Sequence, residues 1–216
     1  MFGLGRKPKL IVHHLNESRS QRVLWMLEEL GCPYELVRHN RDPQTRLAPP
    51  ELKAIHPLGK APVIVDGGRT IHESAAILDY LARRYGKGRF SPAPDSPDYD
   101  RYQQWMHYAE GSAALPMMLT LYVGRLGEAG APLLPRIESE TANHLGYIEQ
   151  ALAGRQFLAG DHLTAADVQI SFVLEGFRAF GKLQDYPNAS AYLDRLHARP
   201  AFRRGVEKGG EYALGR

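Results

Sequence analysis

The sequence predicts an α/β domain followed by an all-α domain. Short apolar runs with the character of strands are confined to residues 9–72, whereas apolar residues recur at helical spacing from residue 98 onward. A stretch rich in proline and glycine separates the two parts and is typical of a linker. The expected organisation is an N-terminal domain over residues 8–86, a linker over 87–97 and a helical domain over 98–216.

The first part is predicted to run strand, helix, strand, strand, strand, helix. Gly31 follows the last apolar residue of the first helix, where glycine commonly ends a helix, and Asp66-Gly67-Gly68 is a turn that joins two strands in a hairpin. A βαβ unit followed by a hairpin and a helix (βαβ-ββα) gives a mixed four-stranded sheet. The expected strands are 9–14, 34–38, 62–65 and 69–72, and the expected helices are 18–30 and 74–85, with a helical turn at 51–55.

The second part is predicted to be entirely helical. Its first helix is long and should bend at Pro116, because a proline inside a helix removes one backbone hydrogen bond. Thr164 with Asp167 three residues later is the pattern of a helix cap and is interpreted as structural. The expected helices are 98–124, 134–152, 165–180, 189–198 and 201–208.

Composition and charge narrow the class of protein. A chain of 216 residues with 44% hydrophobic residues can bury a core without disulfides, and its net charge of +3 favours an anionic small ligand over nucleic acid. Cys32 is the one cysteine, which fits a reducing compartment, and a cytoplasmic location is expected. No apolar run approaches ~18 residues, and the first nine residues lack the apolar core of a secretory signal, so no membrane partner is expected.

Two serines lie at the start of the first predicted helix. Unpaired N–H groups and the helix dipole favour an anion at such a position, and a hydroxyl there can donate to it. Ser18 with Gln21 three residues later also matches a capping box, so the Ser18 hydroxyl could simply close the helix. Ser20 offers a second hydroxyl close by.

A proline begins the third predicted strand. The Ala61–Pro62 bond is predicted to be cis, which would turn the N–H and C=O of Ala61 towards a peptide-like ligand, and Lys60 could meet a carboxylate of that ligand. The alternative is that Pro62 merely begins an edge strand and that Lys60 is solvated.

A carboxylate and a hydroxyl lie together at the start of the predicted helix over 74–85. Ser74 is expected at the N-cap of this helix, where free N–H groups favour a carboxylate, and Glu73 can accept from an ammonium group. The pair suits a ligand end that carries an ammonium group and a carboxylate on one carbon. The alternative is an ordinary helix cap beside a surface acid.

The order and spacing of these motifs resemble the cytosolic glutathione transferase family, and most closely its bacterial and fungal members with a serine at the first helix. The resemblance covers roughly residues 9–208. The motifs that carry it are Ser18-Arg19-Ser20-Gln21-Arg22, His56-Pro57-Leu58-Gly59-Lys60-Ala61-Pro62, Glu73-Ser74-Ala75-Ala76-Ile77 and Phe157-Leu158-Ala159-Gly160-Asp161-His162-Leu163-Thr164-Ala165-Ala166-Asp167.

The resemblance implies a thioredoxin-like N-terminal domain that binds glutathione and a helical domain that contributes a pocket for an electrophile. The catalytic hydroxyl of the family lies four residues before the arginine of the first motif, which gives Ser18, with Ser20 as the alternative. The resemblance further implies glutathione binding by Lys60, Ala61, Pro62, Glu73 and Ser74, a homodimer, a role in detoxification, and glutathione as co-substrate without a permanently bound cofactor.

The expected reaction is conjugation of the glutathione thiolate to an apolar electrophile. Aromatic and methionine side chains of the first helix of the second domain are candidates for the pocket, although such a stripe is also typical of plain core: Trp105, Tyr108, Met117, Met118 and Tyr122. No metal is predicted, because the nine histidines do not cluster at ligand spacing and His13 and His14 on one strand face opposite ways. The alternatives are glutathione-dependent isomerisation, dehalogenation or disulfide reduction, and glutathione binding without turnover.

Overall fold

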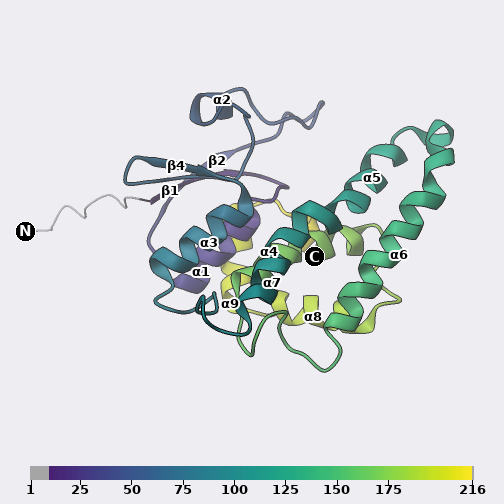
Figure 1. Cartoon of the computed structure of the whole chain (residues 1–216). Helices are drawn as coiled ribbons and strands as arrows, with labels where there is room; N and C mark the ends of the chain where they lie inside the picture. Colours follow the sequence, from purple (N-terminus) through teal and green to yellow (C-terminus); the bar gives the residue numbers. More distant parts are fainter. Residues whose placement is uncertain (1–9, 216) are drawn as a thin grey trace, which may run out of the picture. The chain divides into compact units, whose positions relative to one another are not determined.

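The computed structural model describes residues 10–215 (Figure 1), so the predicted assignments to residues 8, 9 and 216 lie outside the described part. The described residues form two compact units. The first comprises residues 10–87 together with 199–215, and the second comprises residues 88–198. The last helix therefore belongs to the first unit and not, as the helical pattern of the sequence predicts, to the helical domain.

The first unit contains the predicted mixed four-stranded sheet. Its strands are β1 (Leu10–Leu15), β2 (Glu35–His39), β3 (Val63–Asp66) and β4 (Arg69–His72), in the order β2-β1-β3-β4. β1 pairs with β2 in parallel and with β3 in antiparallel fashion, and β3 pairs with β4 in antiparallel fashion. The parallel pair of the βαβ unit and the antiparallel hairpin were predicted from the sequence, whereas the pairing of β1 with β3 was not specified.

Helices cover both faces of this sheet. α1 (Gln21–Leu30) and α3 (Ser74–Tyr85) lie on one face, and the short α2 (Leu52–Ile55) lies on the other (Figure 1). Gly31 ends α1 in the left-handed conformation with φ of 65°, as predicted for a C-terminal glycine. α1 begins three residues later than expected, because the residues from Ser18 to Ser20 form a turn.

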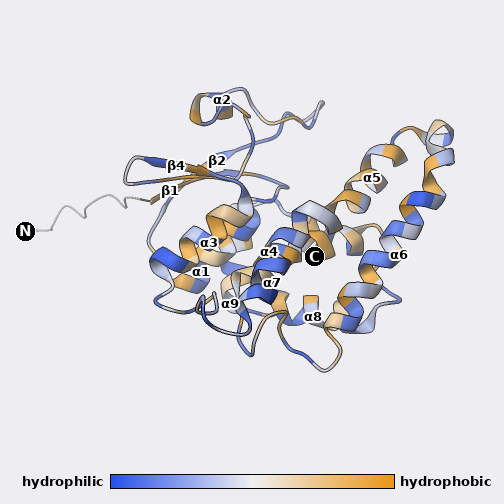
Figure 2. Cartoon of the chain, viewed as in Figure 1, coloured by the Kyte–Doolittle hydropathy of each residue, from blue (hydrophilic) through white to orange (hydrophobic). Residues whose placement is uncertain are grey.

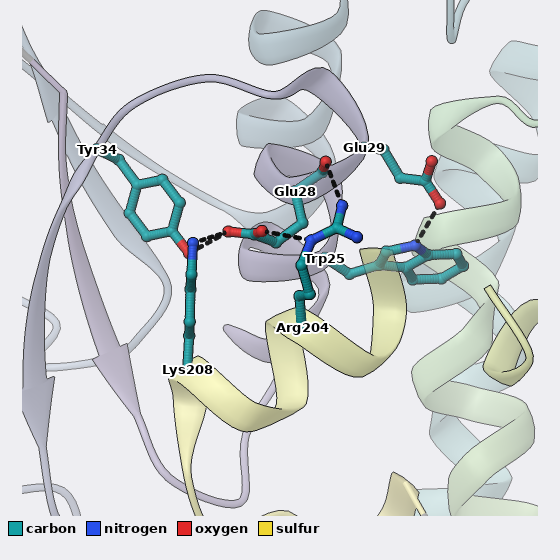
Figure 3. A network of polar contacts seen from close by, with 6 residues as sticks. All are labelled: Trp25, Glu28, Glu29, Tyr34, Arg204 and Lys208. Atoms are coloured by element: carbon teal, nitrogen blue, oxygen red, sulfur yellow. Dashed lines mark hydrogen bonds and ion pairs between the residues drawn. The ribbon is translucent and has the colours of Figure 1, made fainter. Parts of the chain in front are cut away.

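Helix α9 (Pro200–Gly209) packs against α1. Their backbones approach closely at Gly205, where an added Cβ would lie 3.0 Å from the N atom of Trp25. Glu28 of α1 accepts hydrogen bonds from Tyr34 Oη at 2.9 Å and Lys208 Nζ at 2.6 Å (Figure 3). Arg204 Nε donates to the same carboxylate at 3.1 Å. This close packing and the shared carboxylate explain why α9 joins the first unit.

The second unit is entirely helical, apart from an isolated bridge between Phe90 and Thr164. The predicted helix over 98–124 is interrupted one turn before Pro116 by a π-helix at Ala109–Ala113. Pro116 has no N–H to donate to the carbonyl of Ser112, and the backbone is widened into a π-helix in the preceding turn. The helices are α4 (Tyr99–Tyr108), α5 (Ala114–Gly124), α6 (Leu134–Ala151), α7 (Ala165–Ala179) and α8 (Pro187–His197), with a 3-10 helix at Gly127–Leu133.

Helix α7 forms the centre of the second unit and is buried from Ala165 to Phe177. Its start carries the predicted cap: Thr164 N–H and Thr164 Oγ1 donate to Asp167 Oδ2 at 2.7 Å and 2.9 Å. Along α6, hydrophilic and hydrophobic residues alternate at helical spacing, which gives this helix one buried face (Figure 2). Of the helices that the structure describes, none combines the length and the apolar character needed to cross a membrane.

Candidate active site

The turn between β1 and α1 brings the two candidate hydroxyls together. Ser18 Oγ donates to Leu15 O at 2.8 Å and lies 2.8 Å from Ser20 Oγ. Ser20 is fully buried, whereas Ser18 keeps 6% of its surface exposed. The residue at the N-cap of α1 is Ser20, which makes no side-chain capping bond, and Ser18 does not form a capping box with Gln21. The hydroxyl of Ser18 is therefore not used to close the helix.

The backbone just before Ser18 adopts an unusual conformation. Glu17 has φ of 51°, in the left-handed region that residues other than glycine rarely adopt. Arg41 holds this turn, because its N–H donates to Asn16 Oδ1 at 2.8 Å and its Nη2 donates to Glu17 O at 3.2 Å. Glu17 Oε1 accepts the N–H of Ala213 at 2.8 Å, so the C-terminal segment also fixes the turn. Strained backbone held in this way is common at functional sites.

His14, which the sequence analysis did not select, contacts the same turn. Its Nδ1 lies 2.8 Å from Ser20 Oγ, and the side chain is 2% exposed. Burial lowers the pKa of His14 to about 4, so the ring is neutral near pH 7. The alternation of the strand indicated that His13 and His14 point to opposite faces of the sheet. It could not show that the turn after β1 brings Ser20 against the His14 ring.

The second motif lies beside the end of β1. The Ala61–Pro62 peptide bond is cis, Pro62 is buried, and Lys60 is exposed. β3 pairs on both sides, so Pro62 does not begin an edge strand. No residue of the described chain forms a backbone hydrogen bond with the N–H or C=O of Ala61, which leaves both groups available.

The third motif lies at the start of α3. Ser74 is the first residue of the helix and Glu73 occupies the N-cap, one residue earlier than expected, and Glu73 has φ of 67°. Such one-residue shifts are usual at helix ends. Ser74 is buried and its Oγ accepts a hydrogen bond from Arg22 Nη2 at 3.0 Å, whereas Glu73 is exposed.

The strand register brings all three motifs to one end of the sheet. Val63 is paired with His13 of β1 and with His72 of β4. Pro62 is therefore level with the last residues of β1, from which the Ser18 turn leaves, and with Glu73 after β4. Arg22 connects the start of α1 to the start of α3 at the same end. Hydroxyls, a free backbone amide and a carboxylate thus lie close together in the first unit.

A separate cavity of about 650 Å³ lies within the second unit, beside the π-helix. Of the expected pocket residues, Trp105 and Tyr108 line it. Tyr108 Oη is 2.7 Å from His144 Nδ1, and the Trp105 ring stacks on that of Tyr147 with centroids 5.3 Å apart. His144 and Tyr147 come from α6 and were not predicted, because nothing in the sequence pairs α6 with α4.

The other expected pocket residues lie elsewhere. Met118 and Tyr122 do not line this cavity, and more than half of Tyr122 is exposed. Met117 is buried and packs against Gly176 of α7, where a Cβ would come within 2.1 Å of its sulfur. Within residues 10–215, no three His, Cys, Asp or Glu side chains come together in a group that could hold a metal ion.

Comparison with protein families gives two matches. The family model described as glutathione S-transferase, N-terminal domain matches residues 18–84, and the model described as glutathione S-transferase, C-terminal domain matches residues 131–195. Among curated relatives, glutathione S-transferase 3 of Schizosaccharomyces pombe is 35% identical, over 92% of this chain and 87% of its own. Glutathione S-transferase 1 of Saccharomyces cerevisiae is 29% identical, over 93% of this chain and 95% of its own.

Solved structures show the same fold. A glutathione S-transferase from Actinobacillus pleuropneumoniae has a TM-score of 0.84 and 34% identity, and covers 96% of each chain. A glutathione transferase family member from Pseudomonas fluorescens, solved with two glutathione bound, has a TM-score of 0.79 and 27% identity, and covers 93% of each chain.

Proposed function

This chain belongs to the glutathione S-transferase family, and we propose that it conjugates the thiolate of glutathione to electrophilic carbon atoms of small molecules. The observation that carries the proposal is the meeting of the three motifs at one end of the sheet. The β3 register and the Arg22–Ser74 hydrogen bond support it. Detoxification of varied electrophiles is the role that fits this reaction.

Ser18 is the proposed catalytic residue, and the chain is accordingly assigned to the serine-type members of the family. The nucleophile is the thiolate, and lowering a thiol pKa by about two units requires about 2.7 kcal/mol. A hydrogen bond to an anion contributes about 1.5–3 kcal/mol, so one hydroxyl supplies most of this stabilisation. Ser18 is favoured over Ser20 because Ser18 is the more exposed of the two and makes fewer hydrogen bonds.

The remaining motifs are proposed to hold the tripeptide. The unpaired N–H and C=O of Ala61 suit the backbone of the cysteinyl residue, as an added strand would pair. Lys60 is exposed and can meet the glycyl carboxylate. At the γ-glutamyl end, Glu73 accepts from the ammonium group, and the start of α3 at Ser74 binds the carboxylate.

The electrophile is proposed to bind in the cavity lined by Trp105 and Tyr108. Its aromatic walls suit apolar and aromatic compounds, and it lies beside a π-helix, a feature frequent at functional sites. A homodimer is the proposed assembly and is tested by light scattering. The cytoplasmic location that the single cysteine favours is tested by cell fractionation.

The test measures binding and turnover separately. Calorimetry with glutathione should show saturable binding, and a crystal of the complex should place the ligand in the first unit with its sulfur within hydrogen-bonding distance of Ser18 Oγ. A panel of aryl halides, epoxides and α,β-unsaturated carbonyls should give conjugates, whereas products from haloacids or disulfides alone would indicate dehalogenation or reduction. Binding without any product would indicate a regulatory protein, and absence of binding at saturating glutathione would overturn the proposal.

A further inference from the structure

His14, Ser20 and Ser18 form a buried chain of hydrogen bonds. Ser20 Oγ lies 2.8 Å from His14 Nδ1 and 2.8 Å from Ser18 Oγ, and it accepts the N–H of Leu15 at 3.1 Å. Ser18 Oγ accepts the N–H of Ser20 at 3.2 Å and lies 2.8 Å from Leu15 O. The heavy-atom positions do not decide which partner donates in the Ser18–Ser20 and Ser20–His14 pairs. That depends on which ring nitrogen of His14 carries the proton.

Each hydroxyl carries one proton and two lone pairs, and a neutral imidazole carries one N–H. If His14 Nδ1 accepts, the Ser20 proton points at the ring, and the single Ser18 proton satisfies either Ser20 Oγ or Leu15 O. If His14 Nδ1–H donates, Ser20 donates to Ser18 and Ser18 donates to Leu15 O. The Nδ1–H tautomer therefore makes one hydrogen bond more with the same atoms.

We propose that His14 is a positioning residue whose Nδ1–H donates to Ser20, so that Ser20 donates to Ser18 and the Ser18 proton can turn from Leu15 O to the glutathione thiolate. In the other tautomer, once Ser18 donates to the thiolate, the single Ser20 proton can serve His14 Nδ1 or Ser18 Oγ, and the other of these two 2.8 Å contacts is left without a proton. This inference rests on the proposed function, because it concerns the hydroxyl that binds the sulfur.

The surroundings of the other ring nitrogen also influence the tautomer. His14 Nε2 and both amide atoms of Gln21 are buried without a hydrogen-bond partner in the described part of the chain. A Cβ at Gly209 would lie 2.6 Å from Gln21 Oε1 and 3.2 Å from His14 Nε2, so the amide and the ring border the same small space. The two ends of an amide are interchangeable by geometry. With its nitrogen towards the ring, the Gln21 amide would present a donor to this space, which suits a bare Nε2 and the Nδ1–H tautomer. The backbone carbonyl of Gly209 beside the ring favours a proton on Nε2 instead, so the tautomer itself has to be measured.

The direct test is the tautomer of His14 in the unsubstituted protein. Histidine labelled with ¹⁵N distinguishes a protonated from an unprotonated ring nitrogen, and the His14→Asn variant identifies the His14 signals. The expected result is a protonated Nδ1 and a bare Nε2 in the glutathione complex. A protonated Nε2 with a bare Nδ1 in that complex overturns the inference.

Two variants test the consequence for the thiol. His14→Leu removes the donor, and the pKa of bound glutathione should rise so that the thiolate fraction falls about tenfold, the effect of one hydrogen bond. His14→Asn places an amide N–H near the position of Nδ1 and should restore most of the thiolate. Affinity for S-methylglutathione, which has no ionisable thiol, should change less than about twofold in both variants.

The outcomes separate the two proposals. If the unsubstituted protein neither binds nor turns over glutathione, the proposed function fails. If it turns over glutathione while His14→Leu keeps the thiol pKa unchanged, only the role of His14 fails. A purely structural role would lower S-methylglutathione affinity in parallel with activity, which would also overturn the inference. Should His14→Leu fail to fold, the labelled protein and His14→Asn still decide.

Discussion

Arg22 Nη2 donates a hydrogen bond to Ser74 Oγ across 3.0 Å, and both side chains are buried. Arg22 belongs to α1 and Ser74 begins α3, so this bond fixes the two helix starts relative to each other. The Ser18 turn precedes one of these helices and Glu73 precedes the other. A single guanidinium thus links the proposed thiol end of the ligand site to its proposed γ-glutamyl end.

Replacement of Arg22 should therefore affect both stability and binding. Arg22→Lys removes the planar fork and leaves Ser74 without this donor, which should lower the free energy of unfolding by about 1.5–3 kcal/mol. Glutathione affinity should fall as well. Urea unfolding and calorimetry measure the two effects. The matched control is Arg83→Lys, where the exposed pair with Asp79 should contribute less than about 1 kcal/mol. Equal losses in both variants would contradict this role of Arg22.

Alanine variants of the two serines should differ. Ser18→Ala should raise the pKa of bound glutathione by about two units, which corresponds to about 2.7 kcal/mol. Ser20→Ala should raise it less, because Ser20 acts through Ser18. Ultraviolet absorbance of the thiolate, titrated against pH, measures both. A larger effect of Ser20→Ala would identify Ser20 as the residue that contacts the sulfur.

Two helical glycines should respond to alanine in opposite directions. At Gly205 of α9 a Cβ would lie 3.0 Å and 3.1 Å from the N and Cα atoms of Trp25, and backbone cannot move aside easily. Gly205→Ala should lower the free energy of unfolding by about 1–3 kcal/mol. At Gly146 of α6 a Cβ meets nothing within 4 Å, so Gly146→Ala should raise it by about 0.5–1 kcal/mol. Urea unfolding tests both, and stabilisation by Gly205→Ala would contradict the close packing of α9 on α1.

Stability should fall in mild acid partly through His14. Burial lowers its pKa from 6.5 to about 4, so the unfolded chain binds more protons than the folded chain between these pH values. The free energy of unfolding should drop by about 3 kcal/mol from this group as the pH falls through that window. His14→Asn should lack this part of the slope. Burial also lowers the pKa values of His13 and His39, but these residues contribute to both proteins alike. Identical slopes would contradict a buried neutral His14.

Local patterns predicted most of the first unit. The hairpin at Gly67-Gly68 and the bounds of β4 and α3 follow from short-range signals, and the structure has β4 at Arg69–His72 and α3 at Ser74–Tyr85, as predicted. The start of α1 was wrong by three residues. The pattern of Ser18 and Gln21 is that of a cap, but the hydroxyls bond instead to Leu15, because the tight turn after β1 folds them back onto the end of the strand.

Contacts between distant parts of the chain could not be predicted in the same way. The local pattern of residues 200–209 does not indicate that α9 packs on α1. The close approach at Gly205 and the pairing of Arg204 and Lys208 with Glu28 become visible only when the two helices are already known to be neighbours. The Trp105–Tyr147 stack likewise requires knowing that α6 lies beside α4. The π-helix has Pro116 as its one local signal. A proline indicates that the helix is irregular nearby, but it does not indicate whether the helix bends, breaks or widens.

The division of the first unit between both ends of the sequence has a consequence for protein synthesis. Residues 88–198 form one uninterrupted stretch, so the second unit needs no later segment to complete it. The sheet and α1, although translated earlier, stay incomplete until residues 199–209 emerge. During that interval the nascent chain presents an uncovered apolar surface around Trp25, against which Phe202 later packs. A ribosome stalled before residue 199 would therefore carry a natural substrate for chaperones.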